Sequence, residues 1–509
     1  RAYRGRYGAW YEARRQYLHA MAAYRLSGDY DALLRVAQED AGILLASLKP
    51  ESVLEVLDQC PAETLKAHPF ALLVLMRSMF NWRQIPRMLA LKELLLAAIG
   101  EHPELPAEER GNLLGECDLI LSFLCYNDIS AMSRLHRSAS ARMSRPAISI
   151  RKSGGWTFGS PSVLMMFYRG PGELERELAE MDECMPHYYR ITDGHGRGAE
   201  RIMRAEALFQ QGRFTDAHIA LEGAYAAIQG NGQENMALCC DFLLWRLSLF
   251  TEMELRRSFP EREAELLRHH NAAWLNLLNA VRAYYYALLG EPERIPEVFG
   301  AHRLESVSIL APGRPMIGMI ENQVYLAQGA WAKVIGCGEG LLGQCEGLHY
   351  ALVALHLRIQ TAAAYGMLGK EAEARALLAQ ALAEAEPDGL LIPFAENFPY
   401  LAEPLRREAA RGTALARAIL PLGEAFLARR QRLRSGDVRP AAFAALTERE
   451  YEIVGLMARR LSNREIAGKL FLSEGSVRQY INQIYSKLQL DGPPRAKRQQ
   501  LLALLETKT

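Results

Sequence analysis

The sequence lacks the features that mark membrane, secreted and metal-binding proteins. No hydrophobic run approaches the ~20 residues that a membrane-spanning helix needs, and no secretory signal opens the chain. The eight cysteines include the adjacent pair Cys239 and Cys240 but no Cys-x-x-Cys spacing. This pattern favours buried free thiols in a reducing cytoplasm over disulfides or a zinc site. We therefore expect a cytoplasmic protein with no membrane contact, no metal and no cofactor.

Catalytic signatures are also missing. The sequence contains no nucleophile elbow, no dinucleotide fingerprint after a strand, and no pair of carboxylates set apart from helix surfaces. It contains no Gly-x-x-x-x-Gly-Lys-Ser/Thr phosphate loop, since segment 366–370 has the wrong spacing. Strand signals are almost absent. We expect an all-α protein of more than one domain that is not an enzyme.

The C-terminal stretch 446–488 has the pattern of three short amphipathic helices. Thr447 and Ser462 each precede a glutamate by three residues, as in a capping box, and Ser473 can cap the third helix. Hydrophobic residues follow these caps at helical spacing, namely Val454, Met457, Ala458, Ile466, Ala467, Leu470, Val477, Ile481, Ile484 and Leu488. The short connection 471–473 joins the last two helices. This pattern describes a helix-turn-helix unit, which predicts binding to double-stranded DNA.

Several linked motifs occur in this stretch in a fixed order. They are Leu446-Thr447-Glu448-Arg449-Glu450, Leu461-Ser462-Asn463-Arg464-Glu465-Ile466-Ala467, Leu472-Ser473, Ser476-Val477-Arg478 and Lys487-Leu488. Together they resemble the LuxR-type helix-turn-helix of bacterial transcription regulators. The resemblance implies a DNA-binding domain over 446–509, whose third helix lies in the major groove.

The outward face of the third helix predicts which residues read DNA. With Val477 and Ile481 packed inward, Arg478, Gln479 and Asn482 point outward near the helix N-terminus. Arginine can form two hydrogen bonds with guanine, and Gln or Asn can form two with adenine. The base-facing positions of the LuxR-type family fall on the same three residues.

Phosphate contacts are expected from neighbouring basic and hydroxyl side chains. We assign them to Ser476, Lys487 and Arg464, together with the N-terminal amides of the helices. Segment 446–509 contains 11 Lys and Arg against 7 Asp and Glu, whereas the rest of the chain contains 49 against 52. Because non-specific DNA affinity depends on positive charge, phosphates should bind at this end of the chain.

The preceding part of the chain is predicted to be a helical repeat array. Helix breaks recur at a regular interval, at Gly172, Gly212, Gly290, Gly329 and Gly369. Their spacings are 40, 78, 39 and 40 residues, so the longest equals two periods. Such a period is typical of stacked helix pairs, and segments 205–225 and 363–381 resemble tetratricopeptide units. We expect a tetratricopeptide-like superhelix over 1–435, followed by a linker over 436–445.

The order of these two parts resembles the C-terminal portion of the MalT-like, large ATP-binding LuxR regulators. In that family a nucleotide-binding module precedes a tetratricopeptide sensor and a LuxR-type helix-turn-helix. The phosphate loop of such a module is absent here, and the first residue is Arg1 rather than methionine. Either the chain is part of a longer protein or this member lacks the ATPase module, and the missing methionine favours the first alternative.

One internal stretch interrupts the helical pattern. Segment 152–162 is rich in glycine and hydroxyl groups and contains two aromatic residues, and further aromatic and polar residues follow at 188–196. Aromatic side chains beside hydroxyls and free backbone amides suit a small polar ligand. The predicted ligand-binding residues are Trp156, Phe158, Ser160, Tyr188 and His195. The alternative is a structured turn that plugs the superhelix.

These observations predict a sequence-specific DNA-binding transcription regulator that senses a signal through its helical part. We expect an activator whose partners are double-stranded DNA, RNA polymerase, and a small-molecule or protein effector. A homodimer on DNA is also expected, because a C-terminal helix carries an apolar patch of Leu501, Leu502, Leu504 and Leu505. The rival interpretation is a tetratricopeptide interaction scaffold whose DNA-binding domain is accessory.

Overall fold

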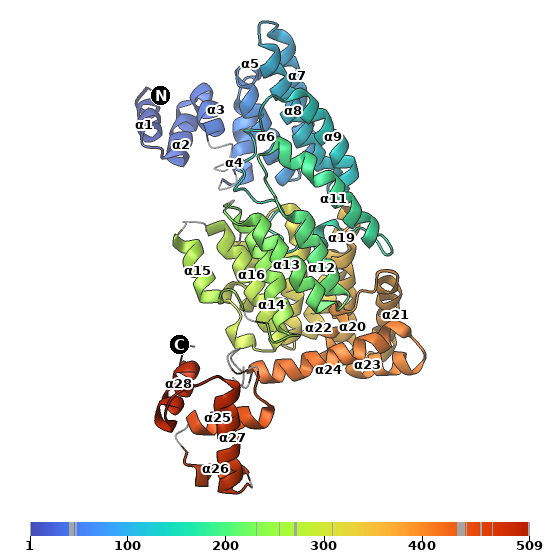
Figure 1. The fold of residues 1–509 in the computed structure, drawn as a ribbon. Coiled ribbons are helices and arrows are strands. Elements are labelled where there is room, and N and C mark those ends of the chain that lie inside the picture. Colours follow the sequence, from blue (N-terminus) through green and yellow to red (C-terminus); the bar gives the residue numbers. More distant parts are fainter. Residues whose placement is uncertain are drawn as a thin grey trace. The chain divides into compact units, whose positions relative to one another are not determined.

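The fold is built from α-helices joined by turns and loops (Figure 1). The computed structural model describes residues 2–39, 45, 48–230, 232–253, 255–268, 272–307, 309–434, 443, 445–458, 461–470 and 472–506. Within these residues there is no β-strand, so the predicted all-α class is confirmed. None of the described helices combines the length and the hydrophobicity that a bilayer-spanning segment requires.

The N-terminal part of the chain forms helices α1 to α11. Their bounds are α1 (Ala2–Ala13), α2 (Tyr17–Ser27), α3 (Tyr30–Glu39), α4 (Pro50–Gln59), α5 (Ala62–Lys66), α6 (Pro69–Asn81), α7 (Ile85–Glu101), α8 (Ala107–Ser122), α9 (Ile129–Arg142), α10 (Leu164–Phe167) and α11 (Leu174–Ile191). The stretch 143–163 between α9 and α10 contains no helix.

The remaining helices continue in the same manner to the C-terminus. Their bounds are α12 (Ala199–Gln210), α13 (Phe214–Ile228), α14 (Glu234–Ser248), α15 (Phe259–Arg268), α16 (Ala272–Leu289), α17 (Glu297–Gly300), α18 (Arg314–Ala327), α19 (Trp331–Leu348), α20 (Ala351–Met367), α21 (Glu371–Ala385), α22 (Ile392–Glu396), α23 (Phe398–Ala410), α24 (Ala414–Arg434), α25 (Glu448–Ala458), α26 (Asn463–Leu470), α27 (Glu474–Lys487) and α28 (Pro494–Glu506).

The chain divides into two compact units. Unit 1 comprises Arg1–Thr251 and Leu255–Leu427, and unit 2 comprises Glu252–Glu254 and Ala428–Thr509. This division falls inside α24. The predicted linker 436–445 lies outside the described residues except at Phe443 and Ala445, so its boundaries stay a prediction.

Glycines with a left-handed backbone end the helices of the repeat region. Gly212, Gly290, Gly329 and Gly369 have φ values between 73° and 76°, and each follows a helix end within two residues. A side chain would be strained in this conformation, so glycine is favoured there. These predicted breaks are confirmed as helix ends, and the helices they separate pack together, as in α12 with α13, α18 with α19, and α20 with α21. The tetratricopeptide resemblance of the pairs stays a prediction.

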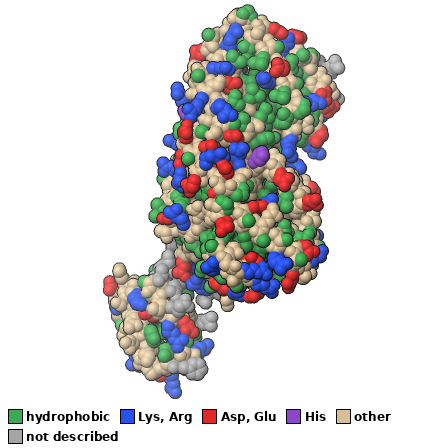
Figure 2. Space-filling model, turned by 90° about the vertical axis from the view of Figure 1, so that its right-hand side faces the viewer, with side chains coloured by type: hydrophobic (Ala, Val, Ile, Leu, Met, Phe, Trp, Pro, Cys, Tyr) green, Lys and Arg blue, Asp and Glu red, His purple; other side chains and the backbone are tan. Residues whose placement is uncertain are grey.

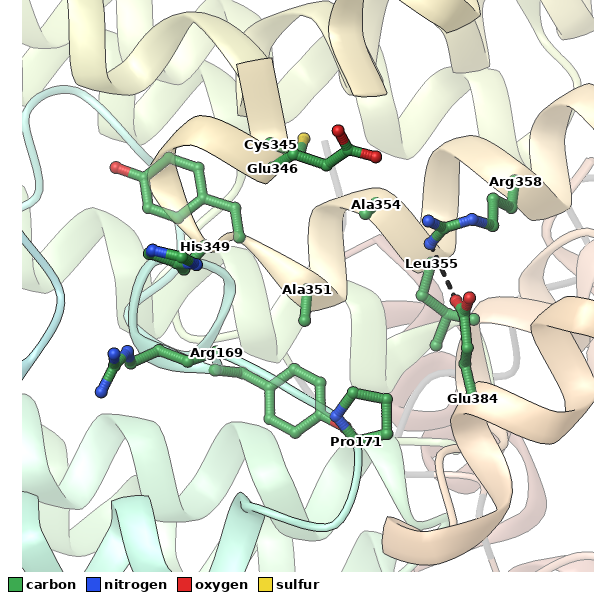
Figure 3. A pocket seen from close by; sticks show the side chains of 12 residues that line it. Arg169, Pro171, Cys345, Glu346, His349, Ala351, Ala354, Leu355, Arg358 and Glu384 are labelled. Atoms are coloured by element: carbon green, nitrogen blue, oxygen red, sulfur yellow. Dashed lines mark hydrogen bonds and ion pairs between the residues drawn. The ribbon is translucent and has the colours of Figure 1, made fainter. Parts of the chain in front are cut away.

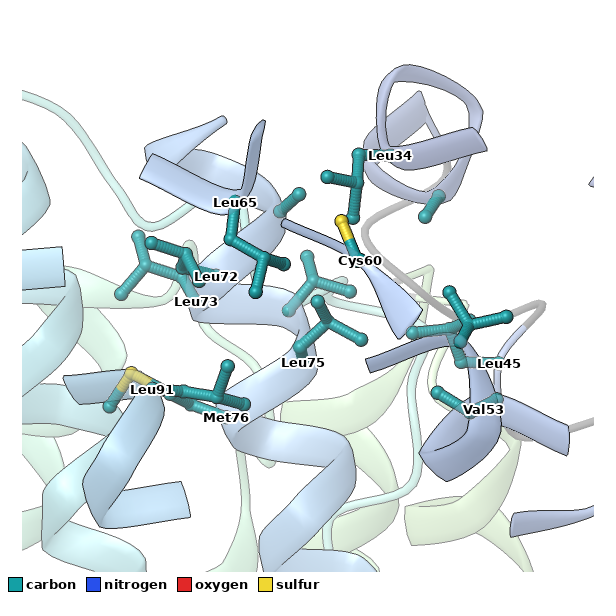
Figure 4. Close-up of a cluster of buried hydrophobic side chains, with 14 of the residues drawn as sticks. Leu34, Leu45, Val53, Cys60, Leu65, Leu72, Leu73, Leu75, Met76 and Leu91 are labelled. Atoms are coloured by element: carbon teal, nitrogen blue, oxygen red, sulfur yellow. The ribbon is translucent and has the colours of Figure 1, made fainter. Parts of the chain in front are cut away.

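The N-terminal core forms around α6 (Figure 4). The run from Ala71 to Met76 is almost entirely shielded from solvent. A helix that is hydrophobic on all sides must be covered on all sides, and α6 contacts α3, α5, α7 and α8. Leu34 of α3 and Val53 of α4 belong to the same cluster. This core anchors the helices that carry one wall of the cavity described below.

The surface of unit 1 has a different character from its core. On the face shown in Figure 2, basic and acidic side chains are interspersed, with hydrophobic side chains between them. Such mixing produces no large field of one sign over this face.

All eight cysteines are free thiols; six are buried, Cys125 is half-buried and Cys337 is exposed.

A buried ion pair ties three helices of unit 1 together. Nε of Arg246 in α14 lies 2.8 Å from Oε1 of Glu396 in α22, and its Nη2 lies 3.0 Å from Oε2. The hydroxyl of Tyr284 in α16 donates to the same carboxylate at 2.8 Å. The guanidinium also lies over the Phe209 ring, 4.8 Å from its centroid. Because both charges are buried, each depends on the other for its solvation.

Removing one partner of this pair should destabilise unit 1 strongly. We expect Arg246→Met to lower the free energy of unfolding by about 3–5 kcal/mol, because it leaves the Glu396 carboxylate buried without a cation. Urea unfolding of the full chain, followed by circular dichroism, measures the change. The double variant with Arg246→Met and Glu396→Met should recover part of the loss, since neither charge is then left alone. A double variant less stable than the sum of both single changes would contradict this explanation.

Candidate functional sites

Reciprocal caps fix the start of the first two helices of the C-terminal trihelical unit. The backbone N–H of Thr447 donates to Oε2 of Glu450 at 2.6 Å, and the N–H of Glu450 donates to Oγ1 of Thr447 at 3.3 Å. Ser462 and Glu465 form the same box, with distances of 2.7 and 3.3 Å. Each box satisfies amide groups that the helix leaves unpaired. The capping boxes predicted from the sequence are therefore confirmed.

The third helix, α27, begins at the predicted cap and buries the predicted face. Oγ of Ser473 accepts a hydrogen bond from the N–H of Ser476 at 3.0 Å. Val477, Ile481 and Ile484 are buried in a core shared with α25, α26 and α28. Phe471 lies outside the described residues, but α26 and α27 contact each other directly. The sequence thus encodes a small domain whose α27 has one buried and one exposed face.

Arg478, Gln479 and Asn482 lie on the exposed face of α27. The side chain of Arg478 is 70% exposed, and its Nη2 is 4.0 Å from Oε2 of Glu474. A surface contact of this length stabilises little, so the guanidinium can turn toward another partner. The spacing of the three residues places them along one strip of the helix. Their side chains carry donor and acceptor groups of the kind that bond to base edges in a major groove.

The residues predicted to contact phosphate differ in their surroundings. Arg464 is exposed on α26, and Ser476 is half-buried at the N-terminus of α27. Lys487, in contrast, already has a protein partner, because its Nζ lies 2.7 Å from Oε2 of Glu450. A phosphate contact by Lys487 would have to share the ammonium group with that carboxylate.

Glu450 joins the first helix of the domain to the end of the third. Its side chain is only 3% exposed, and burial raises its pKa. Hydrogen bonds from Lys487 and from Thr447 outweigh burial and hold the pKa of Glu450 below its usual value. The carboxylate is therefore charged in the folded domain and links α25 to α27.

Two further arginines have structural roles that the sequence patterns did not reveal. Nη2 of Arg449 donates to the carbonyl of Leu470 at 2.6 Å, at the C-terminal end of α26. Nη2 of Arg498 in α28 donates to the carbonyl of Leu461 at 3.0 Å. The first contact places a cation at the C-terminal carbonyls of a helix, which is favourable, and the second ties α28 to the loop between α25 and α26. In both cases donor and acceptor are far apart in the sequence.

The predicted apolar patch on α28 is divided between core and surface. Leu501 is fully buried in the core of the domain, and Leu504 packs against that core. Leu502 is half-buried, and the side chain of Leu505 lies outside the described residues. Leu501 is thus not part of an uncovered patch, since the domain itself covers it.

A cavity of about 600 Å³ lies within unit 1. Its walls come from α6, α9, α11, α16, the stretch 143–163 and the residues that follow α17. Four of the five predicted ligand-binding residues line it, namely Trp156, Phe158, Tyr188 and His195. Its volume is within the range of roughly 300–1,000 Å³ that is common for small-molecule sites.

Trp156 and Phe158 are held in place by their backbones as well as by their rings. The N–H of Trp156 donates to Oδ1 of Asn235 at 2.8 Å, and its ring stacks on Phe167 with centroids 5.2 Å apart. Phe158 has a φ of 52°, a conformation that is costly for a residue with a bulky side chain. A Cβ at Gly196 would come within 2.3 Å of the Trp156 ring, so the close approach of that turn needs glycine.

Tyr188 and His195 form a hydrogen-bonded chain at the cavity wall. The Tyr188 hydroxyl lies 2.7 Å from Nδ1 of His195, and Nε2 of His195 lies 3.2 Å from the carbonyl oxygen of Gly154. A carbonyl can only accept, so Nε2 carries the proton and Nδ1 accepts from the tyrosine. Burial lowers the pKa of His195 to about 4. The imidazole is therefore neutral at physiological pH, and both of its nitrogens are occupied.

Ser160 does not line the cavity. Its hydroxyl donates to the carbonyl of Ser162 at 2.9 Å, and its own carbonyl accepts from the Thr157 hydroxyl at 2.5 Å. These bonds close the turn that follows Phe158, so the hydroxyl of Ser160 faces its own loop. The prediction that Ser160 shares a pocket with the other four residues is corrected by this geometry.

A second hollow of about 290 Å³ lies beside α19, α20 and α21 (Figure 3). Its lining carries charges of both signs. Nη1 of Arg358 and Oε2 of Glu384 are 2.8 Å apart within it and pair with each other. This hollow is smaller than the first, and part of its charge is already neutralised by its own residues.

Comparison with known proteins assigns the C-terminal domain to a class. Its capped helices and its helix-turn-helix define a DNA-binding type of fold. Residues 444–497 match the family described as bacterial regulatory proteins, luxR family. This confirms the LuxR-type resemblance for the C-terminal domain, which is a LuxR-family helix-turn-helix.

Two curated relatives are similar to a part of this chain. The DNA-binding transcriptional activator DevR/DosR of Mycobacterium tuberculosis is 29% identical in an alignment of 89 residues that covers 16% of this chain and 41% of the relative. The transcriptional regulatory protein LnrK of Bacillus subtilis is 42% identical over 50 residues, which are 10% of this chain and 23% of the relative. The chain thus spans less than half the length of either relative.

The Glu450 carboxylate predicts a pH-dependent stability of the C-terminal domain. Its pKa is lower in the folded domain than in the unfolded chain, so its contribution is present above about pH 4.5 and is lost as the pH falls through the folded pKa. We expect Glu450→Gln to cost about 1–3 kcal/mol at pH 7, because hydrogen bonds to a buried charge are lost. Hydrogen exchange of α25 and α27 peptides in the full chain, corrected for intrinsic rates, measures this cost.

The exposed capping box provides a matched control for this change. Glu465→Gln removes the corresponding carboxylate at Ser462, where the side chain is exposed and Lys469 acts only through its charge, and should cost less. The difference in stability between the Glu450→Gln variant and the parent protein should become smaller below pH 4.5. A difference that stays constant down to pH 3 would contradict a stabilising role of the charge.

Proposed function

We propose that this protein is a cytoplasmic transcription regulator that activates genes in response to a signal. The observation that carries the proposal is the exposed strip of Arg478, Gln479 and Asn482 on α27, in a domain of the LuxR family. One relative is described as a DNA-binding transcriptional activator. That description supports double-stranded DNA as the partner and activation as the outcome.

In this proposal α27 enters the major groove with its N-terminal half. Arg478 donates two hydrogen bonds to a guanine, while Gln479 and Asn482 bond to adenines or to neighbouring edges. Arg464 and Ser476, at the starts of α26 and α27, hold the adjacent phosphates. The amide groups at those helix starts add to the attraction for phosphate.

The active form on DNA is proposed to be a homodimer that recruits RNA polymerase. A two-fold pair of domains reads two half-sites about one DNA turn apart, roughly 10 base pairs. The half-buried Leu502 on α28 supports a small contact between copies. Leu501 contributes indirectly, because it fixes α28 to the domain core.

Unit 1 is proposed to be the sensor, in the manner of the MalT-like regulators. The cavity of about 600 Å³ supports a small-molecule effector, because a concave, largely apolar site of this size is typical of small-molecule binding. This observation favours the sensor over the interaction scaffold. Trp156, Phe158, Tyr188 and His195 are the proposed ligand-contacting residues.

The base-reading role of α27 is tested by Arg478→Ala. We expect it to cost about 1–3 kcal/mol on the preferred operator and to relax the base preference at one position, because a bidentate contact is lost. A selection from random DNA identifies the operator, and binding titrations on operator and random duplexes measure the change. Footprinting in the same experiment should show two half-sites.

Arg464→Ala is the matched control, since it removes an exposed arginine that is proposed to contact phosphate. It should weaken operator and random DNA alike and reduce the salt dependence of binding. Lys487→Ala is less suitable, because it also leaves Glu450 without its cation. Equal losses on operator and random DNA for Arg478→Ala would contradict base reading by α27.

The sensing role of the cavity is tested by Trp156→Ala. We expect it to abolish the rise in melting temperature caused by an effector found in a panel of neutral and charged metabolites, while operator affinity stays unchanged. The variant should also lose about 3–5 kcal/mol of stability without ligand, because a buried, stacked ring is removed. Trp331→Ala, which removes a ring outside the cavity lining, should retain the full effector response. Retention of that response by Trp156→Ala would contradict the sensor site and favour a structural plug.

A further inference from the structure

The walls of the large cavity are unusually rich in aromatic rings. Its lining includes Trp82, Phe123, Trp156, Phe158, Phe167, Tyr188, Trp274 and Phe299. Three of the six tryptophans of the chain are among them. Rings of this kind contact flat, apolar molecules through offset-stacked and edge-to-face arrangements. The body of a matching ligand is therefore aromatic.

The charged groups of the lining are all of one sign. Arg77 on α6 and Arg151 in the stretch 143–163 both line the cavity, and among the described lining residues there is no Asp or Glu. The positive charge of Arg77 affects groups in the cavity wall. Burial has the largest effect on the pKa values of Tyr188 and His195, and the charge of Arg77 contributes a lowering of both. Two guanidinium groups attract an anion in this cavity, that of the half-buried Arg77 and that of the exposed Arg151.

The other polar groups of the wall do not offset this preference. His195 is neutral, and its two nitrogens are used by Tyr188 and Gly154. Among the described lining residues, the charged side chains are thus the two arginines.

The size of the cavity limits the ligand to a small number of rings. A cavity of about 150 Å³ holds one benzene molecule, and this one is about 600 Å³. Two or three linked or fused rings with one acidic substituent fit such a volume. A single ring would leave much of the aromatic wall without contact.

We propose that the cavity binds an aromatic organic anion, with its rings among Trp156, Phe158 and Trp274 and its carboxylate or sulfonate toward Arg77 and Arg151. The inference rests on the proposed sensor function of unit 1 and specifies the chemical class of its effector. The arginines attract the acidic group, and the aromatic wall contacts the rings. Neutral aromatic molecules and non-aromatic acids each lack one of these interactions and therefore bind more weakly.

Two dyes with the same ring skeleton test the requirement for an anion. The full chain is titrated with 8-anilinonaphthalene-1-sulfonate and with N-phenyl-1-naphthylamine, which lacks the sulfonate, and dye fluorescence is read through energy transfer from tryptophan. We expect one equivalent of the sulfonate to bind at least about tenfold more tightly than the amine, the scale of one charge-assisted contact. Equal affinities for the two dyes would overturn the anionic class.

Arginine variants locate the contact. Arg77→Gln and Arg151→Gln should each weaken sulfonate binding by about tenfold and leave amine binding unchanged. Arg77 also donates to the carbonyl of Ser149, so Arg77→Lys, which retains the charge, should restore part of the sulfonate affinity if the fold is intact. Arg137→Gln, an exposed change on α9 outside the lining, should alter neither dye. Sulfonate binding that is unchanged in both glutamine variants would overturn the proposal.

A cavity-filling variant shows whether the dyes bind inside. Ile309 lines the cavity from a non-helical segment, and Ile309→Trp should prevent binding of both dyes. Unchanged binding would place the dyes elsewhere and overturn the proposal.

Competition distinguishes aromatic from aliphatic acids: 1-naphthoate should displace the sulfonate, and dodecanoate should do so poorly. Stronger displacement by dodecanoate would overturn the aromatic class. Operator binding by the same variants is measured in parallel, and its loss would count against the regulator function rather than against the ligand class.

Discussion

Unit 1 depends on buried side chains that accept hydrogen bonds from the backbone amides of the stretch 143–163, between α9 and α10. Helices satisfy their own amides and carbonyls, but a buried segment without helix must find partners elsewhere. Three side chains of neighbouring helices accept hydrogen bonds from amides of this stretch: Asn112 from Ser144, Glu116 from Ile148 and Ser149, and Asn235 from Trp156 and Thr157. Glu206 accepts from the amide of Leu164, where α10 begins. The stretch can enter the helical array only because these acceptors are already in place.

The same constraint explains why the cavity lies where it does. Stacked helix pairs fill the space between them with side chains at regular spacing. In the irregular stretch, regular side-chain packing is replaced by two other kinds of contact. Asn235 of α14 holds the backbone at Trp156 through a hydrogen bond, and the Trp156 ring stacks on Phe167. Burial raises the pKa of Glu206 to about 7, which reflects how far the supporting acceptors lie from solvent. The cavity is thus a consequence of the way the stretch is anchored.

Local patterns in the sequence were sufficient for the helix ends and the caps. The capping boxes at Thr447 and Ser462 and the left-handed glycine turns at Gly212 and Gly369 involve neighbours within a few residues. These caps and turns can be predicted from the sequence because their interacting residues are close together in the chain. The aromatic residues around Trp156 could also be recognised, since they break an otherwise helical pattern.

Contacts between distant residues could not be predicted in this way. Nothing near Lys487 in the sequence indicates that Glu450 holds it, and nothing near Arg246 indicates Glu396. The arginines of the cavity lie outside the motif that pointed to the site, because Arg77 belongs to a helix whose pattern signals only a core. Ser160 was included for its hydroxyl, but the hydroxyl is used by its own turn.

The two candidate sites therefore differ in what their residues do for the fold. Arg478, Gln479 and Asn482 lie on a surface that the domain core does not need. If they read DNA as proposed, the operator sequence alone can set their identities. Trp156 and His195 are bound into the wall that they form, so a change there alters stability and recognition together. Recognition by α27 can diverge by single substitutions, whereas the cavity must be reshaped through residues that leave its backbone anchors intact. The proposed effector class is thus more constrained by the fold than the proposed operator sequence is.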